Sequence, residues 1–192
     1  GGISGASHGF ILGGYQTGGG GNYIDKFAYA SNTTASDIGD CSPVVFAAGA
    51  AGSTSYAYST GGCIVSEART NHIQKVAFES GTNAADVGDL TNSIATPAGH
   101  SGGTTYGFIS GGGPSNVIQR ITYASSGNST DWADLTWSIN HFCGSESTTY
   151  GYGMSGYPNS NVIQKFPFAT QTNATDVGDL SQTSGAGASA HN

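Results

Sequence analysis

A fourfold internal repeat constrains the fold of this chain more than any other feature of its sequence. Each unit holds a glycine-containing segment, then an isoleucine-containing segment, then Asp-x-x-Asp. The units follow one another at steps of 49, 45 and 45 residues. The units differ in length in the segment between the glycines and the isoleucine. A constant core with one variable loop per unit is typical of repeat proteins. The isoleucine and the first Asp are 13 residues apart in every unit: 24 to 37, 73 to 86, 118 to 131 and 163 to 176.

Each unit has the pattern of short β-strands. In the third unit Ile118, Arg120 and Thr122 alternate with Gln119, Ile121 and Tyr123, which is the period of a strand. Glycines followed by a polar loop indicate a hairpin. We expect four strands in this unit, at about 96–101, 106–110, 117–123 and 132–136. The 32 glycines and the 9% of charged residues suggest disorder when they are taken alone, but a regular repeat requires a folded chain.

Four strands in about 45 residues match one blade of a β-propeller, so the predicted fold is an all-β small propeller of about four four-stranded blades. We expect one domain over 1–192, with units at about 1–42, 43–91, 92–136 and 137–181. Residues 182–192 are expected to complete the ring with 1–14, by pairing of N- and C-terminal strands. The alternative is that the chain is one arc of a larger ring that a second copy completes. Segments of small residues, such as 47–52 and 97–102, suit the crowded innermost strands.

The order of the motifs resembles the kelch repeat. An aromatic-x-aromatic pair precedes the glycines, a strand with alternating aromatics follows the variable loop, and Trp132-x-x-Leu135 ends the third unit. The other three units depart from the kelch pattern, because they carry Ile or Val in place of the Trp. The recurring Asp-Val-Gly-Asp-Leu also resembles kelch-like repeat proteins encoded by marine bacteriophages. This resemblance implies a non-enzymatic binding or structural module, located in a virion or outside the cell.

Composition and charge exclude two classes of partner. Only five Lys and Arg stand against twelve Asp and Glu, for a net charge of −7, so the chain lacks the basic surface that nucleic acid requires. No apolar run approaches the roughly 18 residues of a membrane span. The sequence therefore predicts neither a nucleic-acid partner nor a membrane.

The paired aspartates of the four units allow two interpretations. Carboxylates suit Ca²⁺, so one calcium site per blade and a Ca²⁺-dependent lectin form one hypothesis. The preferred interpretation is structural: one Asp closes an Asx turn and the other pairs with the cation of its unit. Those cations are Lys26, Lys75, Arg120 and Lys165.

No catalytic, cofactor or metal motif is present. The chain has neither a nucleophile elbow nor a phosphate-binding glycine loop, and its His residues lack metal-ligand spacing. Cys41 occupies the place of a leucine in the other units and is predicted to be a core residue. The enzymatic alternative is a hydrolase or lyase in an axial channel, built on His100, Glu146 and His191. It requires these side chains to converge within hydrogen-bond reach.

The variable loops are the expected binding surface, because recognition commonly lies in loops on a rigid frame. Tyrosines there can stack on sugar rings, whereas Trp132 is predicted to be a core residue. We expect a surface glycan or a protein as partner, with other virion proteins as further partners, and no cofactor. The candidate ligand-binding residues are Tyr15, Tyr23, Arg69, His72, Tyr157 and Asn159.

Overall fold

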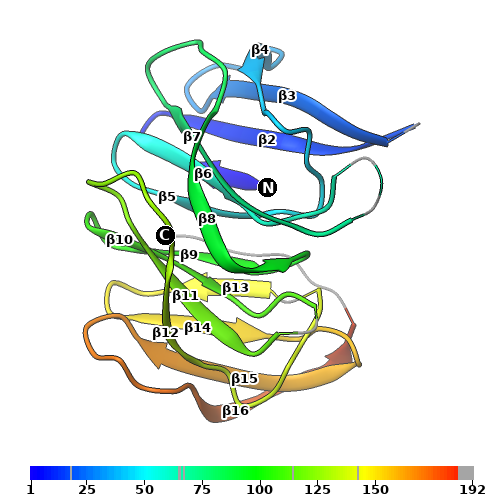
Figure 1. Ribbon diagram of the computed structural model, residues 1–192, viewed down its shortest axis with the longest axis vertical. Coiled ribbons are helices and arrows are strands. Elements are labelled where there is room, and N and C mark those ends of the chain that lie inside the picture. The colour runs from blue at the N-terminus through cyan, green and yellow to red at the C-terminus, as the bar shows by residue number, and fades with distance from the viewer. Residues whose placement is uncertain (18, 65, 67, 114, 142, 186–192) are drawn as a thin grey trace.

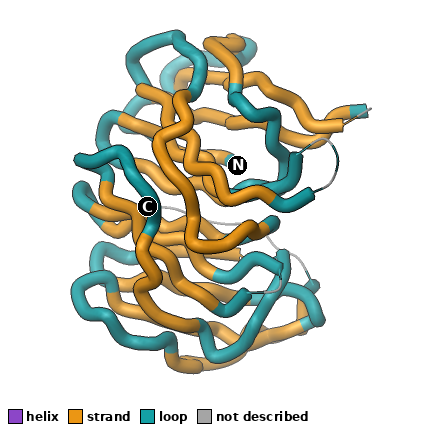
Figure 2. The backbone as a smooth tube through the Cα atoms, in the orientation of Figure 1, coloured by secondary structure: helices purple, strands orange, loops and turns teal. Residues whose placement is uncertain are grey.

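The computed structural model describes residues 1–192 except 18, 65, 67, 114, 142 and 186–192. The described residues form four four-stranded antiparallel sheets and no helix (Figures 1 and 2). The all-β prediction is confirmed. The first sheet is β1 (Gly2–Ser4), β2 (His8–Gln16), β3 (Gly19–Ala28) and β4 (Ser36–Asp40); the second is β5 (Gly49–Gly52), β6 (Tyr56–Thr60), β7 (Thr70–Ala77) and β8 (Ala85–Ile94); the third is β9 (Ala98–Gly102), β10 (Tyr106–Ser110), β11 (Val117–Thr122) and β12 (Thr130–Asp134); the fourth is β13 (Cys143–Glu146), β14 (Tyr150–Met154), β15 (Ser160–Pro167) and β16 (Thr175–Ser184).

Each sheet is a meander, in which every strand pairs with the next along the chain. In the third sheet the strands begin and end within two residues of the expected positions. The register is the same from sheet to sheet, because the recurring cation always pairs across the ladder with one aromatic of the aromatic-x-aromatic motif. These pairs are Phe10↔Lys26, Tyr58↔Lys75, Phe108↔Arg120 and Tyr152↔Lys165.

The sheets pack face to face in chain order. Strand β1 contacts β5, β5 contacts β9, and β9 contacts β13. Three hydrophobic clusters fill the interfaces between the first and second, second and third, and third and fourth sheets. Trp132 lies in the third cluster and is 8% exposed, as predicted for a core residue. In Figure 1 the first and fourth sheets lie at opposite ends of the long axis, with the other two between them.

One stacked pair of aromatic rings joins the two sheets at every interface. The first member is the aromatic that faces the cation in the ladder, and the second lies five residues after the recurring isoleucine of the next sheet. The centroids are 4.6 to 5.0 Å apart and the planes within 27° of parallel, a geometry that aromatic pairs favour. The pairs are Phe10–Phe78, Tyr58–Tyr123 and Phe108–Phe168.

Hydrogen bonds also join each sheet to the next at repeated positions. A fully buried glutamine accepts a bond at 2.6–2.7 Å from a backbone N–H of the preceding sheet's last strand or the segment that follows it. The second Asp of the first three motifs takes part through its backbone. Its N–H donates to an Asn side chain of the next sheet, and its C=O accepts from the N–H of the residue that follows this Asn. The glutamines are Gln74, Gln119 and Gln164; the Asp–Asn pairs are Asp40–Asn83, Asp89–Asn128 and Asp134–Asn173.

The two structural roles predicted for the aspartates have different outcomes. The Asx turn is confirmed in three units, where Oδ1 of Asp37, Asp86 or Asp176 accepts from the N–H two residues later. The ion pair between the second Asp and the cation is wrong for the described residues. In the ladder Lys75 pairs with Ala85, whereas Asp89 pairs with His72, three residues away along β7. Each cation instead lies over aromatic rings, as Arg120 does over Tyr106 and Trp132 at 4.5 and 4.2 Å.

Cys41 is a core residue, as its repeat position predicts. It is 2% exposed and packs in the cluster between the first and second sheets. Burial raises the pKa of its thiol to about 11, and burial likewise raises the pKa of Tyr58 to about 12. Both groups are therefore neutral in the folded protein at physiological pH.

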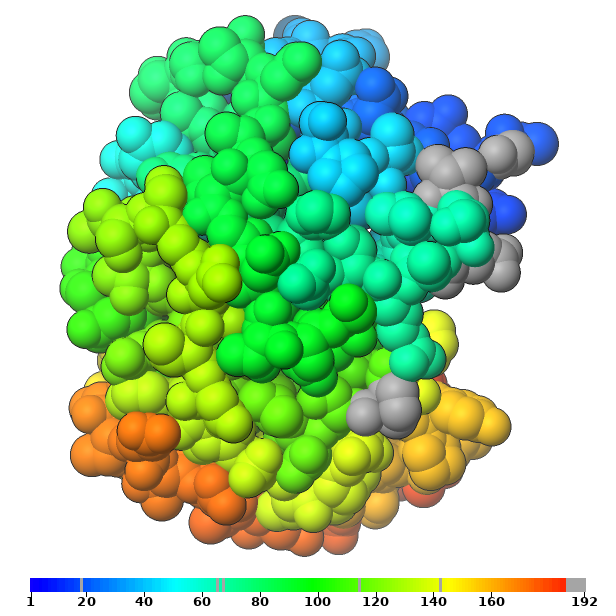
Figure 3. Space-filling model, in the orientation of Figure 1, coloured from blue at the N-terminus to red at the C-terminus, as the bar shows by residue number. Residues whose placement is uncertain are grey.

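The expected pairing of N- and C-terminal strands stays a prediction, and the four described strands of the first sheet all come from residues 2–40. The place beside β2 is filled by β1, with Ile3 opposite Phe10, because residues 2–4 themselves supply an inner strand. Part of that prediction falls on 186–192, which lie outside the described residues. Among the described strands, the close packing of inner strands runs from β1 to β13 and does not return from β13 to β1. Figure 3 shows the first residues of the chain, in blue, at the upper right and the fourth sheet, in orange, at the bottom of the molecule.

Candidate functional site

The variable loops and the connections between sheets lie at one end of the strands. In a meander the link from second to third strand and the link from one sheet to the next leave from the same edge. In Figure 1 the β2–β3 hairpin and the β6–β7 loop both project to the right. A hollow of about 350 Å³ opens at this edge. Its lining is Phe46, Ala47, Cys63, Arg69, Ala95, Thr96, Asn140 and His141, and we call it the rim hollow.

Three residues of the rim hollow have left-handed backbone conformations and occupy one repeat position. Ala47, Thr96 and His141 have φ of 54°, 57° and 51°, and they are 49 and 45 residues apart. Each lies where the chain turns into the inner strand of the next sheet. They are tied in series, since Thr96 N donates to Ala47 O at 2.7 Å and His141 N donates to Thr96 Oγ1 at 2.9 Å. Left-handed conformations of residues other than glycine are strained and cluster at functional sites.

The polar side chains of the rim hollow can recognise an anion. Arg69 and His141 are exposed, and Asn140, which also lines the hollow, is half-buried. A guanidinium binds a carboxylate through two parallel hydrogen bonds, and an amide or imidazole adds a further donor. Arg69 is also the one cation of the sequence outside the recurring position. The hollow therefore places a spare cation beside hydrogen-bonding groups.

Two of the predicted tyrosines flank the rim hollow. Tyr15 is 70% exposed and its ring meets the ring of Phe46 edge to face at 5.4 Å. Tyr157 is 61% exposed, and its backbone forms a β-bridge with Asn140. Asn159 is exposed two residues farther along the same loop. The structure thus brings Arg69, Tyr15 and Tyr157 to one surface.

Tyr23 and His72 do not join this group. The half-buried ring of Tyr23 covers Gly14 and Gly21 of its own sheet. Nδ1 of His72 lies 3.2 Å from Asp86 Oδ2 and 4.0 Å from Asp89 Oδ1, across β7 and β8. Both residues sit directly before the recurring isoleucine, where the strand has already paired, so they belong to the sheet rather than to the loop.

Two of the axial candidates, His100 and Glu146, lie on the neighbouring inner strands β9 and β13, and each forms hydrogen bonds with described residues. His100 is fully buried, with Nδ1 3.2 Å from Ser145 O and Nε2 2.8 Å from Ser110 Oγ. Since the carbonyl can only accept, Nδ1 donates the bond to Ser145 O. Glu146 Oε2 accepts from Ser101 N at 2.6 Å. His100 and Ser110 resemble a Ser–His pair, but neither exposes surface to a substrate; His191 lies outside the described residues.

Sequence reasoning missed Phe46, Thr96, Asn140 and His141. They lie in the connections between sheets, which carry no motif of their own. The signal that could have found them is the unit step itself, because adding 49 and then 45 to position 47 gives 96 and 141. No group of three or more potential metal ligands occurs among the described residues, and no helix among them is long and apolar enough to cross a membrane.

The comparisons with known proteins add no relative. No model of a known protein family matches the chain, and no curated protein matches it. The resemblance to kelch repeats and to phage-encoded proteins stays a prediction from the sequence.

Proposed function

We propose that the chain is a kelch-like β-propeller module without enzymatic activity, whose rim hollow binds a surface glycan that carries carboxylate groups. The four repeated sheets stacked in chain order support the propeller arrangement. The setting that fits is an extracellular or virion-associated adhesive assembly, as the resemblance to phage-encoded repeats implies.

One observation carries the proposed ligand class: Arg69 lines the rim hollow together with Asn140 and His141, and exposed Tyr15 and Tyr157 flank it. Sugar rings present apolar faces that stack on aromatic side chains, and their hydroxyls need amide partners. A carboxylate on the sugar would pair with Arg69 in a molecule whose net charge is −7 and whose other cations cover aromatic rings. An acidic glycan fits these groups better than a neutral one.

Titration of the protein with a polygalacturonate oligosaccharide and with a neutral galactan of the same length tests the proposal. Hydrogen bonds to a charged group are worth about 1.5–3 kcal/mol, so Arg69→Gln should weaken polygalacturonate binding about 10- to 100-fold. Binding should also weaken as salt is raised. Ala169→Glu is the matched control, because it makes the same change in net charge at an exposed loop on the opposite edge of the fourth sheet.

Two results would count against this function. If polygalacturonate and galactan bind equally, the carboxylate has no role. If Arg69→Gln and Ala169→Glu weaken binding equally, the effect comes from net charge and not from the rim hollow. Binding of neither sugar, in a screen that includes sialylated glycans, would leave a protein partner as the remaining adhesive function and would overturn the glycan proposal.

A further inference from the structure

The first and fourth sheets each leave one face uncovered, and the two faces carry the two halves of the contact that joins the sheets elsewhere. On the first sheet Tyr29 is 51% exposed and Phe27 is 40% exposed, whereas the equivalent residues of the other sheets are buried. These buried equivalents are Phe78, Tyr123 and Phe168 for Tyr29, and Val76, Ile121 and Phe166 for Phe27. In the second, third and fourth sheets this face packs against the preceding sheet. In the first sheet the same face is exposed.

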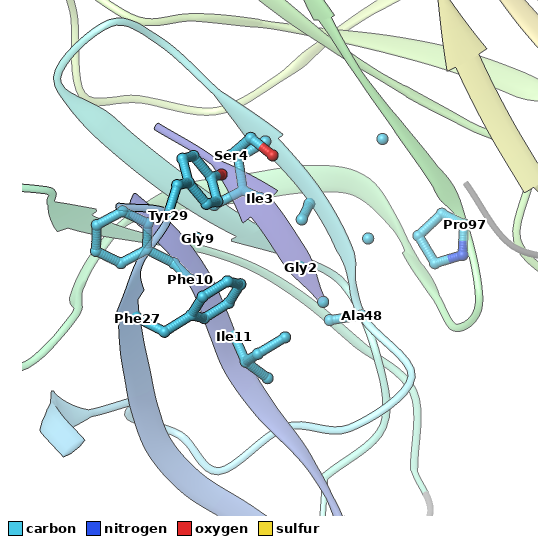
Figure 4. A pocket seen from close by; sticks show the side chains of 14 residues that line it. Gly2, Ile3, Ser4, Gly9, Phe10, Ile11, Phe27, Tyr29, Ala48 and Pro97 are labelled. Carbon is cyan, nitrogen blue, oxygen red and sulfur yellow. The ribbon is translucent and has the colours of Figure 1, made fainter. Parts of the chain in front are cut away.

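This face borders a hollow of about 490 Å³. Figure 4 shows Tyr29, Phe27 and Ile11 side by side on the first sheet, with Ala48 and Pro97 across the hollow. Apolar side chains supply most of the larger groups around it, and no described residue of its lining has a charged side chain. An exposed apolar surface of this kind marks a site of association.

The fourth sheet presents the opposite half. Val177 is 46% exposed where the equivalent Trp132 is buried, and Ile163 is half-buried where its three equivalents are fully buried. Tyr152 is half-buried and has no stacked ring among the described residues, although its three equivalents each stack on the following sheet. Tyr29 is likewise without a stacked partner there, because its ring meets only Phe27 edge to face.

The two end sheets also carry the equivalents of the groups that form hydrogen bonds at the other interfaces. At each of the three interfaces within the chain, a buried residue of the later sheet donates its N–H to the C=O of the second Asp of the sheet before it. These residues are Ala84, Ser129 and Ala174, each 7% exposed. The equivalent residue of the first sheet, Ala35, is exposed. Asp25 occupies the repeat position of the three buried glutamines. Ser181 occupies the repeat position of Ser42, Thr91 and Thr136, whose N–H groups donate to those glutamines. A carboxylate accepts from a backbone N–H as an amide oxygen does.

We propose that the uncovered face of the first sheet binds the uncovered face of the fourth sheet of a second copy of this chain, with Tyr29 stacked on Tyr152 of the other copy. The contact is head to tail, so it generates a ring if its rotation closes. Two copies give eight sheets, which is within the four to eight blades of known propellers. The inference rests on the propeller arrangement proposed above and is independent of the glycan, because the two hollows share no lining residue.

Sedimentation analysis of the protein over a wide range of concentration tests the proposal. The wild type should sediment at twice the chain mass of 19.3 kDa. Tyr29→Asp and Val177→Asp should each sediment as the monomer, since each destroys one half of the contact. Tyr15→Asp, which alters a more exposed tyrosine at the rim, should remain associated like the wild type.

The decisive arm mixes the two monomeric variants. Each keeps one intact face, and the two intact faces are complementary, so the mixture should associate while each variant alone does not. A wild type that stays monomeric would overturn the proposal, and so would association that Tyr29→Asp abolishes and Val177→Asp leaves intact, because that result means like faces pair. Circular dichroism confirms that each variant is folded, and polygalacturonate binding by Tyr29→Asp separates this proposal from the glycan proposal.

Discussion

The buried glutamine between the second and third sheets provides the sharpest test of how the sheets are joined. Gln119 is fully buried and makes four side-chain hydrogen bonds. Its Oε1 accepts from Thr91 N at 2.6 Å, from Thr91 Oγ1 at 2.9 Å and from Ser129 Oγ at 2.8 Å, and its Nε2 donates to Asn92 Oδ1 at 2.8 Å. Gln119→Leu removes all four and keeps the size of the side chain.

The magnitude follows from the number of bonds. Each hydrogen bond contributes a net of about 1 kcal/mol, so the loss is about 4 kcal/mol. Burial of the apolar end of the leucine adds about 1–2 kcal/mol to the free energy of unfolding. The free energy of unfolding should therefore fall by about 2–3 kcal/mol, which in a chain of this size lowers Tm by about 5–10 °C.

Gln164→Leu is the matched control at the next interface. Gln164 is equally buried, but its Oε1 accepts only from Thr136 N and Oγ1, and its Nε2 has no hydrogen-bond partner among the described residues. Losing two bonds and an unpaired amide should change the free energy of unfolding by less than about 1 kcal/mol. Urea titrations of both variants measure the two values. A loss at Gln164 equal to or larger than the loss at Gln119 would refute the reasoning.

Three further predictions concern the core, the inner strands and the rim. The folded chain keeps the Cys41 proton to about pH 11 and the unfolded chain loses it near pH 9.0, so the free energy of unfolding should fall as pH rises between these values. Cys41→Ala should reduce that fall by up to about 3 kcal/mol in urea titrations across this range. Gly99→Ala should lower Tm by several degrees, because its Cβ would overlap the backbone oxygen of Ala50 in the neighbouring inner strand, whereas Gly127→Ala meets no atom and should not. Ala47→Gly should leave stability unchanged or raise it by about 1 kcal/mol, since its φ of 54° suits glycine; a loss above that size by thermal melting would show that the conformation is not strained.

The repeat was sufficient to predict the sheets, because strand period and unit step act locally along the chain. It also identified Cys41 and Trp132 as core residues, since each replaces or matches an apolar residue at a fixed position. The partner of the cations was not predictable in this way. Lys75 and Asp89 lie in the same unit, but the ladder places Lys75 opposite Ala85, and only the register shows that it faces the ring of Tyr56 at 4.0 Å.

The candidate site was predictable only in part, for a similar reason. Arg69, Tyr15 and Tyr157 were found because they lie in the segments whose sequence and length vary between units. Thr96 and His141 reach the same hollow from connections between sheets, and the contact between those connections depends on how the sheets stack. The exposure of Tyr29 was equally hidden, since nothing in a repeated sequence distinguishes an end sheet from a central one.

Cross-linking between copies tests the central claim, that the end faces of this chain complete one another. In a Cys63→Ser background, which removes the half-exposed native cysteine, Tyr29→Cys protein and Tyr152→Cys protein are mixed and treated with a short bis-maleimide. The account predicts a cross-linked species of twice the chain mass in the mixture, and far less of it when either variant is treated alone. Cross-linking within a single chain that carries both substitutions, without any product between chains, would contradict the account and show that one copy closes upon itself.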